Sequence, residues 1–210
     1  MPSAADESLS IGACLHRYYY GTTMLDHTES IFNNLYLGGN FTKKQEGAAI
    51  QEKCGSNIEV KELDDIDASV ATLLANGEIV ARSRGRMEWG ARALGNRSIL
   101  VSGHDYRVVD ELNQAIKQRD FWMPFAPSIR AESSERYFSD PKGINPQFMT
   151  HTFETGAEGR AHLAAGTHPR DHTIRAQVVR EKANPDYHRL LSAFEKKTGR
   201  GGLVLSLIHI

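Results

Sequence analysis

A segment dense in arginine and glycine, residues 82–97, lies between two short apolar runs of this chain. It holds five arginines, one glutamate and no lysine, with glycines at 85, 90 and 95. The flanking runs at 79–81 and 99–101 each predict a strand, so the arginines are expected on a rigidly mounted loop. Planar guanidinium groups on a glycine-rich backbone suit phosphate and carboxylate oxygens. The segment therefore predicts an anion-binding loop in an α/β fold, with an ordinary basic surface loop as the alternative.

Hydrophobic periodicity divides the rest of the chain into helices and strands. Helices are predicted at 9–20, 42–53, 64–77, 105–119 and 186–197, the first of them buried. Further strands are predicted at 58–60, 173–180 and 203–205. Two prolines make 120–130 an edge or irregular strand, because proline cannot donate a hydrogen bond to a sheet. Weak periodicity with several prolines and glycines predicts a long irregular insertion at 139–173.

Bulk charge indicates no particular partner, because 25 lysines and arginines nearly balance 26 aspartates and glutamates over 210 residues. Cys14 and Cys54 have no paired spacing, which argues against a disulfide scaffold and a zinc ribbon. The amino terminus has no basic stretch followed by an apolar run, and no window approaches the roughly 18 apolar residues of a membrane span. We therefore expect a soluble, cytoplasmic protein.

The sequence contains no match to the common phosphate-binding, nucleophile or metal motifs. Gly90 and Gly95 have the spacing of a phosphate-binding P-loop, but Asn96 and Arg97 stand where its lysine and its serine or threonine belong. No Gly-x-Ser-x-Gly elbow points to a covalent nucleophile. No metal site is expected from the later histidines either, which we expect to be solvated or hydrogen-bonded within the protein. These histidines are 151, 162, 168 and 172.

Lys117 and Arg119 end the helix predicted at 105–119, where basic residues commonly complement the helix dipole. Phe121 and Trp122 follow directly, and an apolar wall beside two cations also suits a partly dry anion pocket. Both interpretations stay open on these residues alone.

Three ordered motifs then carry a resemblance. Residues 85–100 read Gly-Arg-Met-Glu-Trp-Gly-Ala-Arg-Ala-Leu-Gly-Asn-Arg-Ser-Ile-Leu, residues 112–121 hold Leu-Asn, Ile-Lys and Arg-Asp-Phe, and residues 124–128 read Pro-Phe-Ala-Pro-Ser. Weaker matches lie at 36–38 and 173–179. Together they resemble the ATP-dependent O-carbamoyltransferases that modify nodulation factors and antibiotics. The resemblance implies a YrdC-like domain, similar to the threonylcarbamoyl-adenylate synthases, with a mixed, twisted open sheet and helices.

The resemblance also implies a division of the chain. Residues 1–38 resemble the carboxy-terminal end of an actin- and sugar-kinase-like metal domain that is mostly missing, and 39–204 resemble an incomplete YrdC-like domain. Relatives continue into an Asn-Thr-Ser-Phe-Asn nucleotide-binding motif, whereas residues 205–210 read Leu-Ser-Leu-Ile-His-Ile. We expect these six residues to come from a sequencing adaptor and the truncated chain to be inactive by itself.

As chemistry, the resemblance implies that carbamoyl phosphate and ATP with Mg²⁺ form a carbamoyl-adenylate, whose carbamoyl group passes to a hydroxyl of a small acceptor molecule. A divalent metal, with iron as one option, is expected only in the missing domain, and a homodimer is left open. No membrane or nucleic-acid partner is expected. Catalysis is assigned to Arg92, Lys117 and Arg119. Substrate and ATP binding are assigned to Arg86, Asn96, Arg97, Ser98, Arg175 and Gln177.

Two positions depart from the pattern of the family. Met123 stands where many relatives have an arginine, and Asp171-His172 replaces Asp-Gly before the next strand. The alternative function is a YrdC-like module that binds double-stranded RNA or tRNA without transferring a carbamoyl group, although Trp89 is the one aromatic residue within 82–97. A hydrogenase-maturation carbamoyltransferase is a third reading, but its acylphosphatase and zinc-finger segments are not visible in this sequence.

Overall fold

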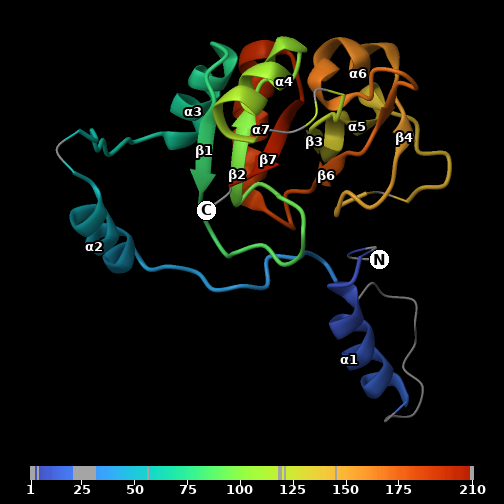
Figure 1. Cartoon of the computed structure of the whole chain (residues 1–210), viewed down its shortest axis with the longest axis horizontal. Coiled ribbons are helices and arrows are strands. Elements are labelled where there is room, and N and C mark those ends of the chain that lie inside the picture. Colours follow the sequence, from blue (N-terminus) through green and yellow to red (C-terminus); the bar gives the residue numbers. More distant parts are fainter. Residues whose placement is uncertain are drawn as a thin grey trace.

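The computed structural model describes residues 3, 5–20, 32–55, 57–117, 120, 122–144 and 146–208, apart from the side chain of Lys117. The strands are β1 (Val80–Ser83), β2 (Arg97–Val101), β3 (Ala126–Arg130), β4 (Phe153–Glu154), β5 (Thr173–Ile174), β6 (Gln177–Val179) and β7 (Gly202–Leu207). Five of them form a mixed sheet in the order β1-β2-β7-β3-β6 (Figure 1). Only β3 and β6 are parallel neighbours in it, and β4 and β5 form a separate antiparallel pair.

Helices cover both faces of the five-stranded sheet. Helices α3 (Ile66–Ala75) and α7 (Pro185–Thr198) pack together over one face, where Leu100 and Leu203 point. Helix α4 (Arg107–Leu112) and the π-helical turn Asn113–Lys117 lie over the other, where Ile99 and Val204 point. Neighbouring residues of β2 and β7 thus face opposite sides, as the period of two in a strand requires. This arrangement confirms the predicted α/β class, a mixed sheet with helices.

The stretch predicted as an irregular insertion contains short elements. Helix α6 (Ala157–His162) and most of the β4–β5 pair lie within it, and α5 (Ser134–Tyr137) precedes it. Phe153 of β4 and Ile174 of β5 pack in a third apolar cluster with Tyr137 of α5 and with Ile129 and Val178 of the main sheet. The strand predicted at 173–180 is interrupted. Its first part belongs to β5 in the small sheet and its second part to β6 in the large one, with Arg175 at the break.

Capping residues that the sequence predicts fix the ends of three helices. Thr42 forms a capping box with Gln45 at the start of α2 (Lys43–Lys53). Asp65 and Asn184 accept hydrogen bonds from the first turns of α3 and α7. Gly199 ends α7 with a φ of 74°, a left-handed conformation that favours glycine.

Two strand predictions were wrong. Residues 126–130 form β3 in the interior of the sheet rather than at its edge, because β6 pairs only from Ser128 onward and leaves that side open at Pro127. Residues 58–60 form no strand. The side chains of Ile58 and Val60 are more than half exposed, and a strand this short needs a partner strand to be stable.

The first predicted helix is present as α1 (Ser8–Tyr20), but its predicted burial was wrong. None of its residues is buried, and Figure 1 shows α1 and α2 apart from the sheet and its helices. An apolar helix is buried only where another element covers it, and the described part of the chain supplies none here. Of the helices that the structure describes, none has the length and apolar character needed to cross a membrane.

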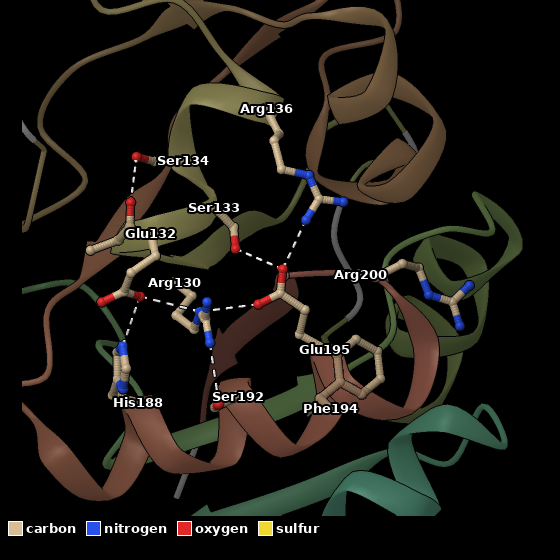
Figure 2. A network of polar contacts seen from close by, with 12 residues as sticks. Arg130, Glu132, Ser133, Ser134, Arg136, His188, Ser192, Phe194, Glu195 and Arg200 are labelled. Carbon is tan, nitrogen blue, oxygen red and sulfur yellow. Dashed lines mark hydrogen bonds and ion pairs between the residues drawn. The ribbon is translucent and has the colours of Figure 1, made fainter.

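A carboxylate near the end of α7 ties that helix to the segment that follows β3 (Figure 2). Glu195 Oε1 accepts hydrogen bonds from Ser133 Oγ at 2.7 Å and from Arg136 Nη1 at 2.8 Å. Its Oε2 lies 3.0 Å from Nε of Arg130, and both side chains of this pair are mostly buried. Charge-assisted bonds of this kind are stronger than neutral ones, so Glu195 should stabilise the packing of α7.

Replacing Glu195 by glutamine is expected to lower the free energy of unfolding by about 1–3 kcal/mol, because Arg130 and Arg136 each lose the more buried of their two carboxylate partners. Urea denaturation of the variant and the parent chain measures this difference. Glu181→Gln, at an exposed position, is the matched control and should change stability by less than about 0.5 kcal/mol. Equal losses in both variants would contradict the role of Glu195.

Candidate active site

Arg97 is part of the scaffold of the arginine loop, which we define as residues 82–98. Its Nη1 donates to the carbonyl oxygens of Arg84 at 3.0 Å and Asn96 at 2.9 Å. Its Nη2 donates to the carbonyl oxygen of Gly85 at 3.0 Å. The guanidinium group therefore joins the two ends of the loop, where it meets β1 and β2. It uses N–H donors of both Nη atoms in hydrogen bonds to backbone carbonyl oxygens.

Arg86 fastens the loop to the segment before α2. Its Nε and Nη2 donate to the carbonyl oxygens of Gly38 at 3.0 Å and Leu37 at 2.9 Å. The backbones of Gly38 and Met87 are also hydrogen-bonded, at 3.0 Å. A Cβ at position 38 would lie 2.6 Å from Cβ of Met87, so glycine is needed for this approach.

Asn96 and Ser98 are buried and hold the loop from inside. Asn96 donates from Nδ2 to the carbonyl oxygen of Arg86 at 2.9 Å and accepts from Nδ2 of Asn184 at 2.8 Å. Ser98 Oγ accepts from the backbone N–H of Gly95 at 2.9 Å. Buried polar groups are normally satisfied in this way, and these two side chains face the loop's own backbone.

Gln177, at the start of β6, is buried in the same network. Its Nε2 donates to the carbonyl oxygen of Leu94 at 3.1 Å, and its Oε1 accepts from Ser128 Oγ at 2.5 Å. The hydroxyl of Tyr36 donates to the same carbonyl at 2.8 Å. Burial raises the pKa of Tyr36 to about 12, since a phenolate would be poorly solvated there. The network thus joins the loop, the sheet and the segment before α2.

Glu88 was not singled out from the sequence, although its carboxylate has a central place in the loop. Oε1 accepts from the backbone N–H groups of Leu94 at 2.8 Å and Asn96 at 2.7 Å, and Oε2 from that of Arg97 at 3.1 Å. The three backbone N–H groups form an anion site inside the loop, and the carboxylate of Glu88 occupies it. The signal in the sequence was that it is the one acid among five arginines.

Arg82 and Arg84 complete the inward side of the loop. Arg82 is buried, and its guanidinium carbon lies 5.4 Å from the ring centre of Tyr187 on α7. Burial lowers the pKa of Arg82 from its ordinary value. Arg84 forms ion pairs with Asp67 at 3.5 Å and Asp186 at 3.3 Å. These two arginines bind the loop to α3 and α7.

Arg92 and Arg175 line one pocket from different parts of the chain. Arg92 is exposed on the outer part of the loop, and Arg175 is half-buried at the break between β5 and β6. The other lining residues are mainly apolar and come from the loop, from the start of β3 and from the end of β7. They are Ala91, Ala93, Pro124–Ala126, Met149 and Leu205–Leu207. Two guanidinium groups at one pocket can bind a doubly charged anion through charge-assisted hydrogen bonds, which are stronger than neutral ones.

A second pocket of about 290 Å³ adjoins the first and shares Arg175 and Pro124–Ala126 with it. Its additional lining residues are Trp122, Met123, Thr152, Gly166, His168 and Thr173. Met123, one of the two departures from the family pattern, therefore lies in the wall of this pocket. We refer to the two connected pockets as the cleft.

Of the nine residues predicted to act at the site, the structure brings Arg92 and Arg175 together at the cleft. Five others support the loop: Arg86, Asn96, Arg97, Ser98 and Gln177. Arg119 lies outside the described residues, as does the side chain of Lys117. The catalytic and binding roles assigned to all nine remain predictions.

Comparison with protein families identifies the family of this chain. A family model described as "Carbamoyltransferase C-terminus" matches residues 71–206, more than half of the chain. The chain belongs to this family. The matched part of this carbamoyltransferase C-terminal domain runs from within α3 to β7, so it includes the arginine loop and the residues around the cleft.

Named relatives resemble this carbamoyltransferase C-terminal domain over part of their own length. Nodulation protein NolO of Bradyrhizobium diazoefficiens is 34% identical over 166 residues, which is 79% of this chain and 30% of the relative. The 3'-hydroxymethylcephem-O-carbamoyltransferase of Amycolatopsis lactamdurans is 41% identical over 130 residues, 62% of this chain and 24% of the relative. The chain thus spans between about a quarter and a third of the length of these curated relatives. Full-length HypF in the phosphate- and nucleotide-bound form aligns with 71% of this chain and 18% of its own, with a TM-score of 0.44 and 17% identity.

Replacing Tyr36 by phenylalanine is expected to lower the free energy of unfolding by about 1–2 kcal/mol, because a buried hydrogen bond is lost. A pH series adds a second measurement. The stability held by neutral Tyr36 is fully present below the ordinary tyrosine pKa of 10.0 and is lost as the pH rises towards about 12. The parent chain should therefore lose more stability between pH 10 and 12 than the variant. Parallel curves would contradict this prediction.

Proposed function

We propose that this domain is the carbamoyl-activating part of an ATP-dependent O-carbamoyltransferase. The observation that carries the proposal is the meeting of Arg92 and Arg175 at one pocket in a member of the carbamoyltransferase C-terminal family. Carbamoyl phosphate has a phosphate dianion of the size and charge that two guanidinium groups bind well. By analogy with the 3'-hydroxymethylcephem-O-carbamoyltransferase, the acceptor would be a hydroxyl of a small molecule.

In the proposed reaction, carbamoyl phosphate loses inorganic phosphate to water, and the carbamate so formed attacks the α-phosphorus of ATP. Pyrophosphate leaves, and the carbamoyl-adenylate then donates its carbamoyl group to the acceptor with release of AMP. Two polyanions must approach each other in the activation step. Arg92 and Arg175 would offset their repulsion and the charge that develops at the phosphorus, as fixed cations do in phosphoryl transfer. Lys117 and Arg119 are proposed to contribute further positive charge in the same step.

Metal ions enter this proposal with the substrates. In the described part of the chain, no three side chains of histidine, cysteine, aspartate or glutamate lie close enough together to hold a metal ion. We propose that Mg²⁺ arrives bound to the phosphate oxygens of ATP, where it would neutralise charge. A divalent metal of the acceptor reaction would belong to an actin-like domain joined to this one, and the assembly would work in the cytoplasm.

The alternative, a domain that binds RNA, draws little support from the loop. It needs a basic surface that tracks phosphates, but four of the five arginines of the loop donate hydrogen bonds to their own chain. Arg92 is the exception among the loop arginines, all of which lie in the described part of the chain.

The decisive test is ATP–pyrophosphate exchange with the longest form of the protein that its gene encodes. Exchange is expected only when carbamoyl phosphate is present. Exchange in its absence would count against the adenylate mechanism. No exchange, together with retention of duplex RNA that weakens steeply with salt, would favour the RNA-binding function instead.

A further inference from the structure

The backbone N–H groups of residues 94–97 point into the interior of the arginine loop. Those of Leu94, Asn96 and Arg97 donate to the carboxylate of Glu88, and that of Gly95 donates to Ser98 Oγ. Gly95 has a φ of 101°, which turns the backbone so that successive N–H groups converge. Converging N–H groups form a concave site for an anion, which we call the nest.

Glu88 fills the nest with a carboxylate from its own loop. Ser98 Oγ adds a donor 3.4 Å from Oε1, so both carboxylate oxygens have partners. The side chain of Glu88 is half-buried, which shields these bonds from water. The donors are backbone groups with fixed positions, so the carboxylate in turn fixes the shape of the backbone around it.

The bond between Glu88 and Leu94 closes a short ring of chain, residues 89–93, and Arg92 lies within it. At its other end the ring is held by the backbone N–H of Trp89, which donates to the carbonyl oxygen of Leu35 at 2.8 Å. Arg92 itself is exposed and makes no side-chain hydrogen bond or ion pair within the described part of the chain; its charge is felt by Glu7, whose pKa is lowered mainly by a hydrogen bond from Ser3 and to a smaller extent by Arg92. The closure of the ring fixes the backbone course from which the Arg92 side chain starts.

We propose that Glu88 is the positioning residue for Arg92: its carboxylate occupies the nest at 94–97 and closes the ring that presents Arg92 to the cleft. The part of this inference that concerns Arg92 rests on the proposed function, while the part that concerns the nest does not. An active site can lose about 100-fold in rate when a group is misplaced by about 1 Å, so loss of closure should be visible in kinetics.

Glu88→Ala empties the nest and allows a test by chemical rescue with formate, at constant ionic strength. The variant should unfold at a temperature about 4 °C or more below the parent, and formate should restore part of this difference. Glu88→Gln is the matched control, because its side chain still fills the nest but brings an N–H₂ group against N–H donors. Formate should not stabilise Glu88→Gln or the parent chain. If Glu88→Ala is unfolded, folding that depends on formate supports the nest, and no response to formate overturns it.

The kinetic arm uses the carbamoyl phosphate-dependent exchange. Glu88→Ala should lower kcat/KM by about 100-fold, and formate should recover at least about 10-fold of it, as expected for a misplaced rather than a missing cation. Formate should recover nothing in Glu88→Ala/Arg92→Ala. Recovery in that double variant, or full activity of Glu88→Ala, would overturn the positioning role. Stabilisation by formate in a protein without any exchange would instead reject the proposed function and leave the nest in place.

Discussion

Arg92→Ala is expected to lower kcat/KM for carbamoyl phosphate-dependent ATP–pyrophosphate exchange by about 100-fold or more, the loss typical of removing one fixed charge from a developing anion. The melting temperature should stay within about 1 °C of the parent, because an exposed side chain contributes little to stability. Steady-state exchange rates and thermal unfolding of the same preparation measure the two effects.

Two variants make the Arg92 prediction specific. Arg92→Lys keeps the charge but loses the planar fork, so it should recover only part of the activity. Arg180→Ala removes an exposed arginine from the turn after β6 and should leave exchange unchanged. If Arg92→Ala retained activity within about threefold of the parent, the cleft would not be the site of carbamoyl phosphate binding.

Gly95→Ala is expected to destabilise the domain by more than about 4 kcal/mol or to prevent folding, the largest effect on stability that we predict. A Cβ at this position would lie 2.3 Å from the ring of Tyr187, which is fully buried on α7. It would also be strained by the φ of 101°. Chemical denaturation, or the yield of soluble protein where the variant does not fold, measures the effect.

Gly90→Ala separates the two causes. Gly90 has a φ of 98°, almost that of Gly95, but a Cβ there would meet no atom within 4 Å. It should therefore cost only the backbone strain, about 1–2 kcal/mol. If the two variants lost equal stability, the contact with Tyr187 would not be the reason for glycine at position 95.

Local rules predicted much of the fold. The two strands that flank the arginine loop, the caps of α2, α3 and α7, and the left-handed Gly199 all follow from short stretches of sequence. The prediction for β3 was wrong because the place of a proline in a sheet depends on where a distant strand begins to pair. The burial of α1 was wrong for a related reason, since burial is a property of the partner as well as of the helix.

The site was predictable in kind but not in detail. An arginine-rich loop between strands indicated an anion site, and Arg92 with Arg175 does line a cleft. Which arginines face inward could not be inferred, because three glycines with positive φ at 85, 90 and 95 remove any simple periodicity of side-chain direction. Glu88 was overlooked although it is the one acid among five arginines. Its partners are backbone N–H groups, which no pattern of side chains reveals.

The position of Arg175 at the break between two sheets bears on how such a domain can diversify. On one side, the cleft is lined by the arginine loop, which hydrogen bonds fix in place. On the other side it is lined by Arg175, which directly follows β5 of the small β4–β5 sheet. Phe153 and Ile174 of that small sheet pack with Ile129 and Val178 of the main sheet, so substitutions in this cluster would shift Arg175 relative to the arginine loop. Evolution could thus retune the width of the cleft for anions of different size without a new fold.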